Sequence, residues 1–248
     1  MRLTGAIVLV TGASGGIGRA TATALARAGA QVVCAGRDAA ATQEVAAAVG
    51  GAALTADLRE VDAPAGLVER TVAQHGRLDA VVVNAGVGHA GPVAEMPAER
   101  IAELVDVNVR GSFLLARAAP AAMTGPGAIV FVSSIAGAVG VPGESVYSAT
   151  KAALEAFAPL LGEELRPARI SVSTVLPGVV DTGFFGRRGA AYDRRFPRPI
   201  PPERVAEVVV RTLRDGRPRR IEPRWLEIPA RLSAAAPRTY RALARRFG

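Results

Sequence analysis

The sequence predicts an α/β protein with a doubly wound, mostly parallel sheet of seven strands and helices on both faces. Two short runs, AIVLV at 6–10 and AVVV at 80–83, are apolar at every position rather than at alternate positions. Such runs are typical of strands that are buried on both faces, as in a parallel sheet covered by helices. Stretches with helical patterns separate the runs, and this regular alternation indicates repeated strand–helix–strand units.

Each apolar run is interpreted as a strand and each stretch between runs as a helix, in chain order. The expected strands are Ala6–Val10, Gln31–Ala35, Ala52–Thr55, Ala80–Val83, Ala128–Val132, Ser171–Leu176 and Arg219–Glu222. The expected helices lie near residues 16–28, 39–49, 63–75, 98–119, 145–166 and 202–214. Residues 118–143 carry no charge, but three prolines and five glycines would interrupt a membrane-spanning helix there. We expect a helix end, the buried strand and a loop in that segment.

The formal net charge of +8 is concentrated toward the C-terminus. Residues 183–248 hold 17 of the 30 basic residues but only 6 of the 22 acidic residues. Charge alone would permit nucleic-acid binding, but this region has few aromatic residues and no recognisable nucleic-acid module. A solvated, arginine-rich surface is the favoured interpretation, and we expect no nucleic-acid partner.

Cysteine and histidine are rare in this chain. The single cysteine, Cys34, excludes an internal disulfide framework and a cysteine-based zinc site. His75 is interpreted as a helix-end residue and His89 as a loop residue, so we expect no metal. The N-terminus shows no signal-peptide pattern, and a reducing, cytoplasmic location fits this composition best.

A glycine-rich turn, TGASGGIG at 11–18, directly follows the first expected strand. Glycines allow the backbone to turn tightly and to approach a pyrophosphate, and the N-terminus of the next helix offers it free N–H groups. Gly12, Gly16 and Gly18 form G-x-x-x-G-x-G, while Gly12, Gly15 and Gly18 also fit G-x-x-G-x-x-G. The turn therefore indicates a dinucleotide site, with a ligand-free turn as the alternative.

Tyr147 and Lys151 lie four residues apart, so they share one face of a helix. Lys151 is the only lysine among the 30 basic residues. A phenol with a pKa of about 10 is a poor acid or base near neutrality, and a nearby cation lowers that pKa. An ammonium is a compact charge with rotatable donors, whereas a guanidinium is a planar fork. We therefore expect Lys151 to serve Tyr147 and a second polar group together.

These motifs resemble the short-chain dehydrogenase/reductase family, in its short, single-domain branch. The glycine turn resembles the family's T-G-x-x-x-G-x-G, NAG at 84–86 its strand-four motif, and PGVVDT at 177–182 its nicotinamide-holding segment. Tyr147 and Lys151 match Y-x-x-x-K, and Ser134 precedes Tyr147 by 13 residues, as the family's serine does. The motifs occur in the family's order and spacing across residues 5–222.

The resemblance implies a Rossmann fold and a hydride-transferring oxidoreductase that uses a nicotinamide cofactor. It implies Tyr147 as general acid/base, Lys151 on the ribose hydroxyls and Ser134 on the substrate oxygen, with Ser133 as the competing serine. It implies that Asn108 holds a water that supplies protons, with a buried, backbone-bonded asparagine as the alternative. The implied cofactor-binding residues are Gly12, Ser14, Gly15, Gly16, Ile17, Gly18, Arg37, Asp57, Leu58, Asn84, Ala85, Gly86, Tyr147, Lys151, Pro177, Gly178, Val180 and Thr182.

The sequence CAGRD, which begins at Cys34, bears on the choice of cofactor. NAD-preferring relatives usually carry an acid at the position of Gly36, whereas Arg37 can pair with a 2′-phosphate. Asp38 is acidic but lies two positions beyond the usual acid, so we expect NADP(H). NAD(H) stays possible, because Gly15 replaces the family's basic loop residue and this weakens the preference. By resemblance Asp57 bonds the adenine amino group, with a strand-end cap as the alternative.

The resemblance and the residue pattern together suggest a catalytic domain over 1–222 and a basic helical extension over 223–248. A lid at about 183–200 contains Phe184, Phe185, Tyr192 and Phe196 and favours a lipophilic ketone, aldehyde or alcohol as substrate. A surface loop pinned by its aromatic residues is the alternative.

From Arg238 a helix would place Tyr240, Leu243 and Phe247 on one apolar stripe. This stripe would pack on the protein's own cleft, on a second subunit or on an anionic membrane. Packing on protein is favoured over peripheral membrane contact, and a homo-oligomer, a dimer rather than a tetramer, is expected. Two other functions stay open: a nucleotide-sensing or scaffold protein, and a lipid-modifying reductase at a membrane surface.

Overall fold

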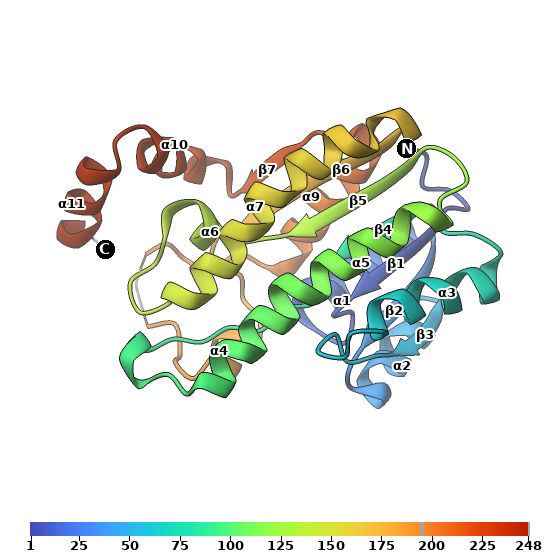
Figure 1. Ribbon diagram of the computed structural model, residues 1–248, viewed down its shortest axis with the longest axis horizontal. Helices are drawn as coiled ribbons and strands as arrows, with labels where there is room; N and C mark the ends of the chain where they lie inside the picture. The colour runs from blue at the N-terminus through green and yellow to red at the C-terminus, as the bar shows by residue number, and fades with distance from the viewer. Residues whose placement is uncertain (194–195, 248) are drawn as a thin grey trace.

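The computed structural model describes residues 1–193 and 196–247, and the side chains of residues 245–247 lie outside that description. Seven parallel strands form one sheet in the order β3-β2-β1-β4-β5-β6-β7 (Figure 1). The strands are β1 Ile7–Thr11, β2 Gln31–Gly36, β3 Ala52–Thr55, β4 Ala80–Val83, β5 Gly127–Val132, β6 Ile170–Pro177 and β7 Arg219–Glu222. Every expected strand is confirmed to within one residue at each end. All of the pairings are parallel, which is stricter than the mostly parallel sheet expected.

The strand order reverses at β1, which pairs with both β2 and β4. Val8 of β1 lies opposite Val32 on one side and Ala80 on the other. The connections that leave β1 and β4 therefore run in opposite directions. In a doubly wound sheet such a reversal opens a crevice beyond the carboxyl ends of the strands, and ligands bind there.

The helices pack on both faces of this sheet (Figure 1). They are α1 Gly16–Arg27, α2 Ala39–Ala48, α3 Ala63–His75, α4 Ala98–Val105, α5 Ser112–Ala118, α6 Ile135–Val139, α7 Ser145–Leu165, α8 Phe184–Arg187, α9 Pro202–Asp215, α10 Glu227–Ala235 and α11 Pro237–Phe247. A π-helical turn, Asp106–Gly111, joins α4 to α5, so the single helix expected near 98–119 contains one wider turn. Short 3-10 turns occupy Val93–Glu95, Ala119–Ala122, Arg166–Ala168 and Arg224–Leu226.

The prediction of a loop between β5 and residue 143 was partly wrong, because this segment contains α6. Ser134 caps this helix: its hydroxyl accepts a hydrogen bond from the backbone N–H of Ala136 at 3.1 Å. A serine cap compensates for an N–H group that has no partner inside the helix. Five residues with two small side chains carry too little periodicity to predict a helix, and the cap is the signal that could have found it.

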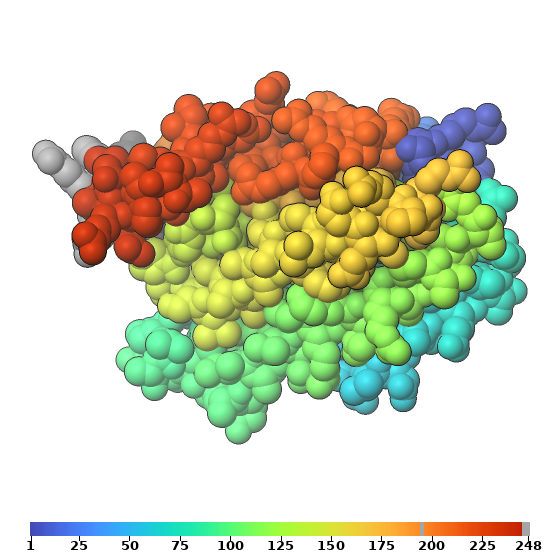
Figure 2. Space-filling model, turned by 45° about the horizontal axis from the view of Figure 1, so that its top comes forward, coloured from blue at the N-terminus to red at the C-terminus, as the bar shows by residue number. Residues whose placement is uncertain are grey.

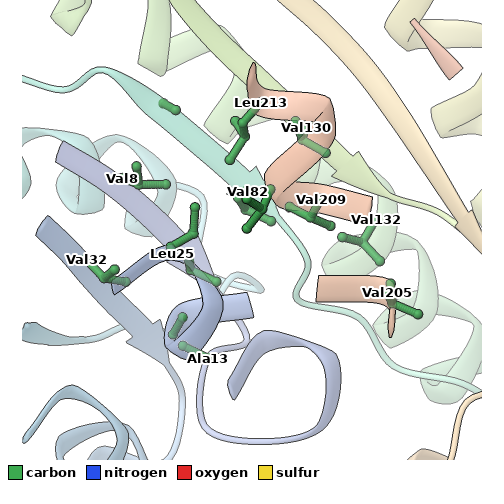
Figure 3. Packing of buried hydrophobic residues seen from close by; sticks show 14 of the residues in the cluster. Val8, Ala13, Leu25, Val32, Val82, Val130, Val132, Val205, Val209 and Leu213 are labelled. Atoms are coloured by element: carbon green, nitrogen blue, oxygen red, sulfur yellow. The ribbon is translucent and has the colours of Figure 1, made fainter. Parts of the chain in front are cut away.

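The core lies in two layers, one on each face of the sheet. On one face, valines of β1, β4 and β5 pack against α1 and α9, where Leu25, Val209 and Leu213 point toward the strands (Figure 3). On the other face, Leu9 packs with Leu67 of α3, Leu115 of α5 and Leu154 of α7. Because successive strand residues alternate between faces, a strand buried on both sides must be apolar throughout.

The C-terminal extension contains α10 and α11 and lies beside α6. Leu226 and Ala230 are buried against Ile135 and Val139, and α11 packs on α10. Figure 2 shows this segment in red next to the yellow-green segment that contains α6. The expected α11 stripe can be followed only as far as Ala244, because the side chains of Arg245, Arg246 and Phe247 lie outside the described residues. Among the described helices, none has the length and apolar character needed to cross a membrane.

Candidate active site

The glycine turn lies against the end of β4, and its shape requires glycine at two positions. Gly12 has a φ of 65°, and a Cβ there would come within 2.9 Å of the Cα of Ala85. A Cβ on Gly18 would lie 2.0 Å from the carbonyl oxygen of Gly12. Larger residues would push the turn away from β4 and from the N-terminus of α1, which points into the cleft.

Hydrogen bonds join the ends of β1 and β4 beneath this turn. The hydroxyl of Thr11 accepts from the backbone N–H groups of Asn84 and Ala85, at 3.0 and 3.1 Å. The amide nitrogen of Asn84 donates to the carbonyl of Thr11 at 2.9 Å. The two connections at the reversal of strand order are thereby held together without a ligand.

Tyr147 and Lys151 project from one face of α7 and are both buried. The Lys151 ammonium lies 5.9 Å from the centre of the Tyr147 ring and donates to the carbonyl oxygen of Val132 at 3.1 Å. Burial raises the pKa of Tyr147 to about 12, against a hydrogen bond with Ser134 that lowers it. Burial lowers the pKa of Lys151 to about 8. Desolvation therefore dominates the pKa of Tyr147, and the cation that lowers this pKa is Arg188 rather than the expected Lys151.

The two neighbouring serines have different partners. The Ser133 hydroxyl donates to the backbone carbonyl of Lys151 at 3.1 Å and is buried. Ser134 instead faces Tyr147, and its hydrogen bond stabilises the ionised phenol. The geometry thus gives Ser133 a structural bond and leaves Ser134 beside the tyrosine, which agrees with the spacing argument.

Asn108 lies in the π-helical turn and is fully buried. Its amide oxygen accepts from the N–H of Val87 at 2.8 Å, and its amide nitrogen donates to the carbonyl of Val87 and to the hydroxyl of Thr150. Side-chain and backbone partners therefore satisfy the amide. These bonds hold the segment after β4 against α7, because Val87 follows β4 and Thr150 lies on α7, one residue before Lys151. A π-helical turn often marks a functional site, but no sequence pattern predicted this one.

Charged residues gather at the end of the cleft that lies beyond β2 and β3. Arg37 is exposed, and its guanidinium lies 4.0 Å from the carboxylate of Glu103 on α4, which also pairs with Arg100. The Asp57 carboxylate accepts hydrogen bonds from the guanidinium of Arg59, and this bond holds the pKa of Asp57 below its usual range. Arg37 therefore faces a carboxylate that the sequence patterns did not bring to attention.

The structure explains the identity of the two residues beside Arg37, Gly36 and Asp38. The Asp38 carboxylate caps α2 by accepting from the N–H of Ala41 at 3.0 Å. A Cβ on Gly36 would lie 2.4 Å from the Thr42 hydroxyl oxygen, and Thr42 is fully buried. An acid at position 36 would therefore require Thr42 to move. This restriction comes from a residue of the next helix, six positions after Gly36, and could not be predicted from the strand alone.

One continuous cleft of about 2040 Å³ contains these groups. Every predicted site residue lines it except Gly18, which packs under Gly12, and Asn108, which lies behind the wall. Thr182 lies beside Gly16, so the segment after β6 closes the cleft near the glycine turn. Within the described residues, no group of three metal-ligating side chains was found.

The lid covers Tyr147 and is fastened by a buried ion pair. The ring of Phe184 lies 5.5 Å from the ring of Tyr147. Arg188 pairs with Glu144, at the start of α7, and its guanidinium carbon lies 4.6 Å from the centre of the Phe185 ring. The sequence patterns missed this pair, because its members are 44 residues apart and each alone resembles a surface charge.

Residues 6–193 match the family described as short chain dehydrogenase. An uncharacterized oxidoreductase of Methylorubrum extorquens is 42% identical over 189 residues, which cover 73% of this chain and 75% of that protein. The probable oxidoreductase EphD of Mycobacterium tuberculosis is 35% identical over 265 residues and 96% of this chain. The chain spans 44% of the length of EphD.

Solved structures resemble most of this chain. A short chain dehydrogenase from Burkholderia cenocepacia in complex with NADP has a TM-score of 0.78 and 32% identity, and the match covers 86% of this chain and 92% of that chain. A 3-ketoacyl-(acyl-carrier-protein) reductase from Brucella melitensis complexed with NADH has a TM-score of 0.77 and 28% identity, with coverage of 85% and 91%. Similar structures therefore hold either nicotinamide cofactor.

Proposed function

The chain belongs to the short-chain dehydrogenase family of oxidoreductases, and we propose that it reduces a lipophilic ketone or aldehyde with NADPH, or oxidises the corresponding alcohol. The observation that carries this proposal is the group formed by the buried Tyr147 and Lys151 and the partly buried Ser134, at the wall of one cleft with the glycine turn. Each of the three has a chemical task in carbonyl reduction, and the cleft is large enough for a cofactor and a substrate together.

The cofactor fits the cradle between the glycine turn and the end of β4. Among the described residues, no side chain fills the space over Gly15, where a Cβ would meet nothing within 4 Å, and the N-terminus of α1 opens onto it. Ser14, Gly16 and Ile17 line this cradle, and Pro177, Gly178, Val180 and Thr182 face it from the other side. When bound, NADP(H) supplies the hydride.

The protein's own groups handle the proton and the developing charge. With a pKa of about 12, Tyr147 keeps its proton at neutral pH and can donate it to the substrate oxygen. Ser134, at hydrogen-bonding distance from Tyr147, orients the same oxygen. Lys151 is mostly protonated at pH 7 because its pKa is about 8, so it supplies a positive charge beside the tyrosine and donors for ribose hydroxyls. Asn108 and Thr150 hold this part of α7 in place.

A preference for NADP(H) over NAD(H) is supported by two features. Arg37 is exposed at the adenosine end of the cleft, where it can pair with a 2′-phosphate. Thr42 occupies the space that an acid at position 36 would need. Reduction is the favoured direction in a cell, because NADP(H) serves mainly as a reductant there. Asp57 would contact the adenine, although Arg59 already holds its carboxylate.

We also propose a cytoplasmic homo-oligomer, a dimer rather than a tetramer. The buried, unpaired thiol of Cys34 suits a reducing compartment. The extension α10–α11 is the segment that would cover one pairing surface. A nucleotide-sensing or scaffold role is less well supported, because the tyrosine, lysine and serine are all present and lie together.

The test is a panel of ketones, aldehydes and secondary alcohols with each cofactor, followed by the absorbance of the reduced nicotinamide. Tyr147→Phe should lower turnover by a factor of about 10² to 10⁴, the usual contribution of a general acid. Its affinity for NADP should change little. Leu160→Asn, at a 67% exposed position of α7 outside the cleft, is the control and should keep full turnover. A Tyr147→Phe variant that kept most of the rate would contradict the proposed mechanism.

A further inference from the structure

Exposed apolar side chains gather at one place, where the lid meets the C-terminal extension. Among the described residues, half of the large exposed hydrophobic side chains belong to these two segments: Phe196, Trp225, Ile228 and Leu243, at 69%, 42%, 73% and 43% exposure. All four line the same cleft as Tyr147. They therefore belong to a concave surface that continues from the reacting group, and they are not scattered over the outside.

The lid forms one wall of this surface through a series of aromatic rings. Starting at Tyr147, the rings of Phe184, Phe185 and Tyr192 follow one another with centre-to-centre distances of 5.2 to 5.8 Å. Farther along, Phe196 stacks on Trp225 at 5.2 Å and joins the lid to the extension. The ion pair between Arg188 and Glu144 fastens this wall to α7.

The extension forms the opposite wall. The buried side chains of Leu226 and Ala230 attach α10 to α6, so that Ile228 and Leu232 are left to line the cleft. Tyr240, Leu243 and Ala244 of α11 line it farther out. The apolar stripe of α11 thus faces the protein's own cleft, which was one of the three positions that the sequence left open.

We propose that this surface, lined by Phe196, Trp225, Ile228, Leu232 and Leu243, is a channel that binds an extended, uncharged apolar chain of the substrate. This rests on the proposed function, because the carbonyl end is placed at Tyr147. An apolar ligand would remove exposed hydrocarbon from water, which is the main source of affinity in such a site. The cleft of about 2040 Å³ also exceeds the roughly 300–1,000 Å³ of common ligand pockets, so a chain fits in addition to a dinucleotide.

Two neutral fluorescent probes that differ only in chain length test the channel without turnover: N-hexyl and N-decyl dansylamide. Each buried methylene is worth about a fourfold gain in affinity at most. We expect wild-type protein to bind the decyl probe at least tenfold more tightly than the hexyl probe. Leu243→Asn and Ile228→Asn should reduce that gain to about threefold or less and leave hexyl binding unchanged. Leu160→Asn, a control at a 67% exposed position of α7 outside the cleft, should keep the full gain.

Equal affinity for both probes in wild-type protein would overturn the proposal. So would a change of molecular mass in light scattering on Leu243→Asn, which would assign the surface to a second copy. If Leu243→Asn lost binding to phosphatidylglycerol vesicles while its probe affinities stayed unchanged, the surface would be assigned to a membrane instead. Reduction of 2-hexanone and 2-decanone separates the two proposals. Turnover that is independent of chain length would contradict the channel but not the proposed function. Tight binding of the decyl probe without reduction of any carbonyl would contradict the proposed function but not the channel.

Discussion

Lys151 should destabilise the folded protein at neutral pH, and its removal should reveal by how much. The side chain is 4% exposed, and burial lowers its pKa from 10.5 to about 8. Each unit of pKa difference is worth about 1.4 kcal/mol, so keeping the ammonium buried costs about 3 kcal/mol. Lys151→Met preserves most of the volume and removes the charge. We therefore expect this variant to be more stable at pH 7 by about 2–3 kcal/mol, after allowance for the lost bond to Val132.

The pH dependence distinguishes this charge effect from a change in packing. Because the folded-state pKa lies below the unfolded-state pKa, the unfolded chain binds the proton more tightly. The cost of the lysine is complete below pH 8, decreases as the pH rises from 8 to 10.5, and vanishes above that range. The advantage of Lys151→Met should accordingly shrink to between zero and about 1 kcal/mol at pH 10.

Urea unfolding of the two proteins at pH 7 and pH 10 measures the difference. Arg166→Met, at an exposed position, is the control and should show no such trend. A Lys151→Met protein that is less stable than wild type at both pH values would refute the reasoning. So would a stability difference that does not change between them. The variant should also lose nearly all carbonyl reduction, which would show that the lysine is retained for function.

The remaining predictions concern the choice of cofactor and use equilibrium binding of NADP and NAD. Arg37→Ala should weaken NADP by about tenfold or more and leave NAD unchanged, whereas Glu103→Gln should strengthen NADP by up to about fivefold, since it frees the guanidinium from an exposed pair. Gly36→Asp should be unstable alone and should favour NAD only together with Thr42→Ala, because the new Cβ needs the space of that hydroxyl; a stable single variant would contradict this. Gly15→Arg should fold normally and tighten NADP, because nothing lies within 4 Å of its Cβ; unchanged NADP binding would argue against a phosphate near the turn.

The strands could be predicted closely because burial on both faces removes polar residues from them. Runs such as those of β1 and β4 are typical of strands that are buried on both faces. The helix α11 was also predictable, since its apolar residues recur at helical spacing. By contrast, α6 depends on one serine cap, and the π-helical turn at Asn108 depends on its partner Val87 in a distant loop. Local patterns do not contain such contacts.

The candidate site shows the same division. Motifs that act through the backbone, such as the glycine turn, consist of residues that are close together in the sequence, so they could be recognised. Groups that act through charge at a distance could not: Glu103 meets Arg37, and Glu144 meets Arg188, only after folding. The adenosine end and the lid were therefore predicted without the carboxylates that complete them.

The structure gives a physical reason for a lysine at position 151 in a chain that otherwise uses arginine. The ammonium lies under Gly86, where an added Cβ would come within 3.3 Å of it and within 3.2 Å of the Asn108 amide oxygen. A planar guanidinium is larger than an ammonium, and it would bring a charge that no accessible pH removes. The ammonium can lie beside a tyrosine whose pKa is raised, and near pH 8 it can gain or lose its own proton. Surface positions impose neither the tight fit nor the need to exchange a proton, so arginine serves there.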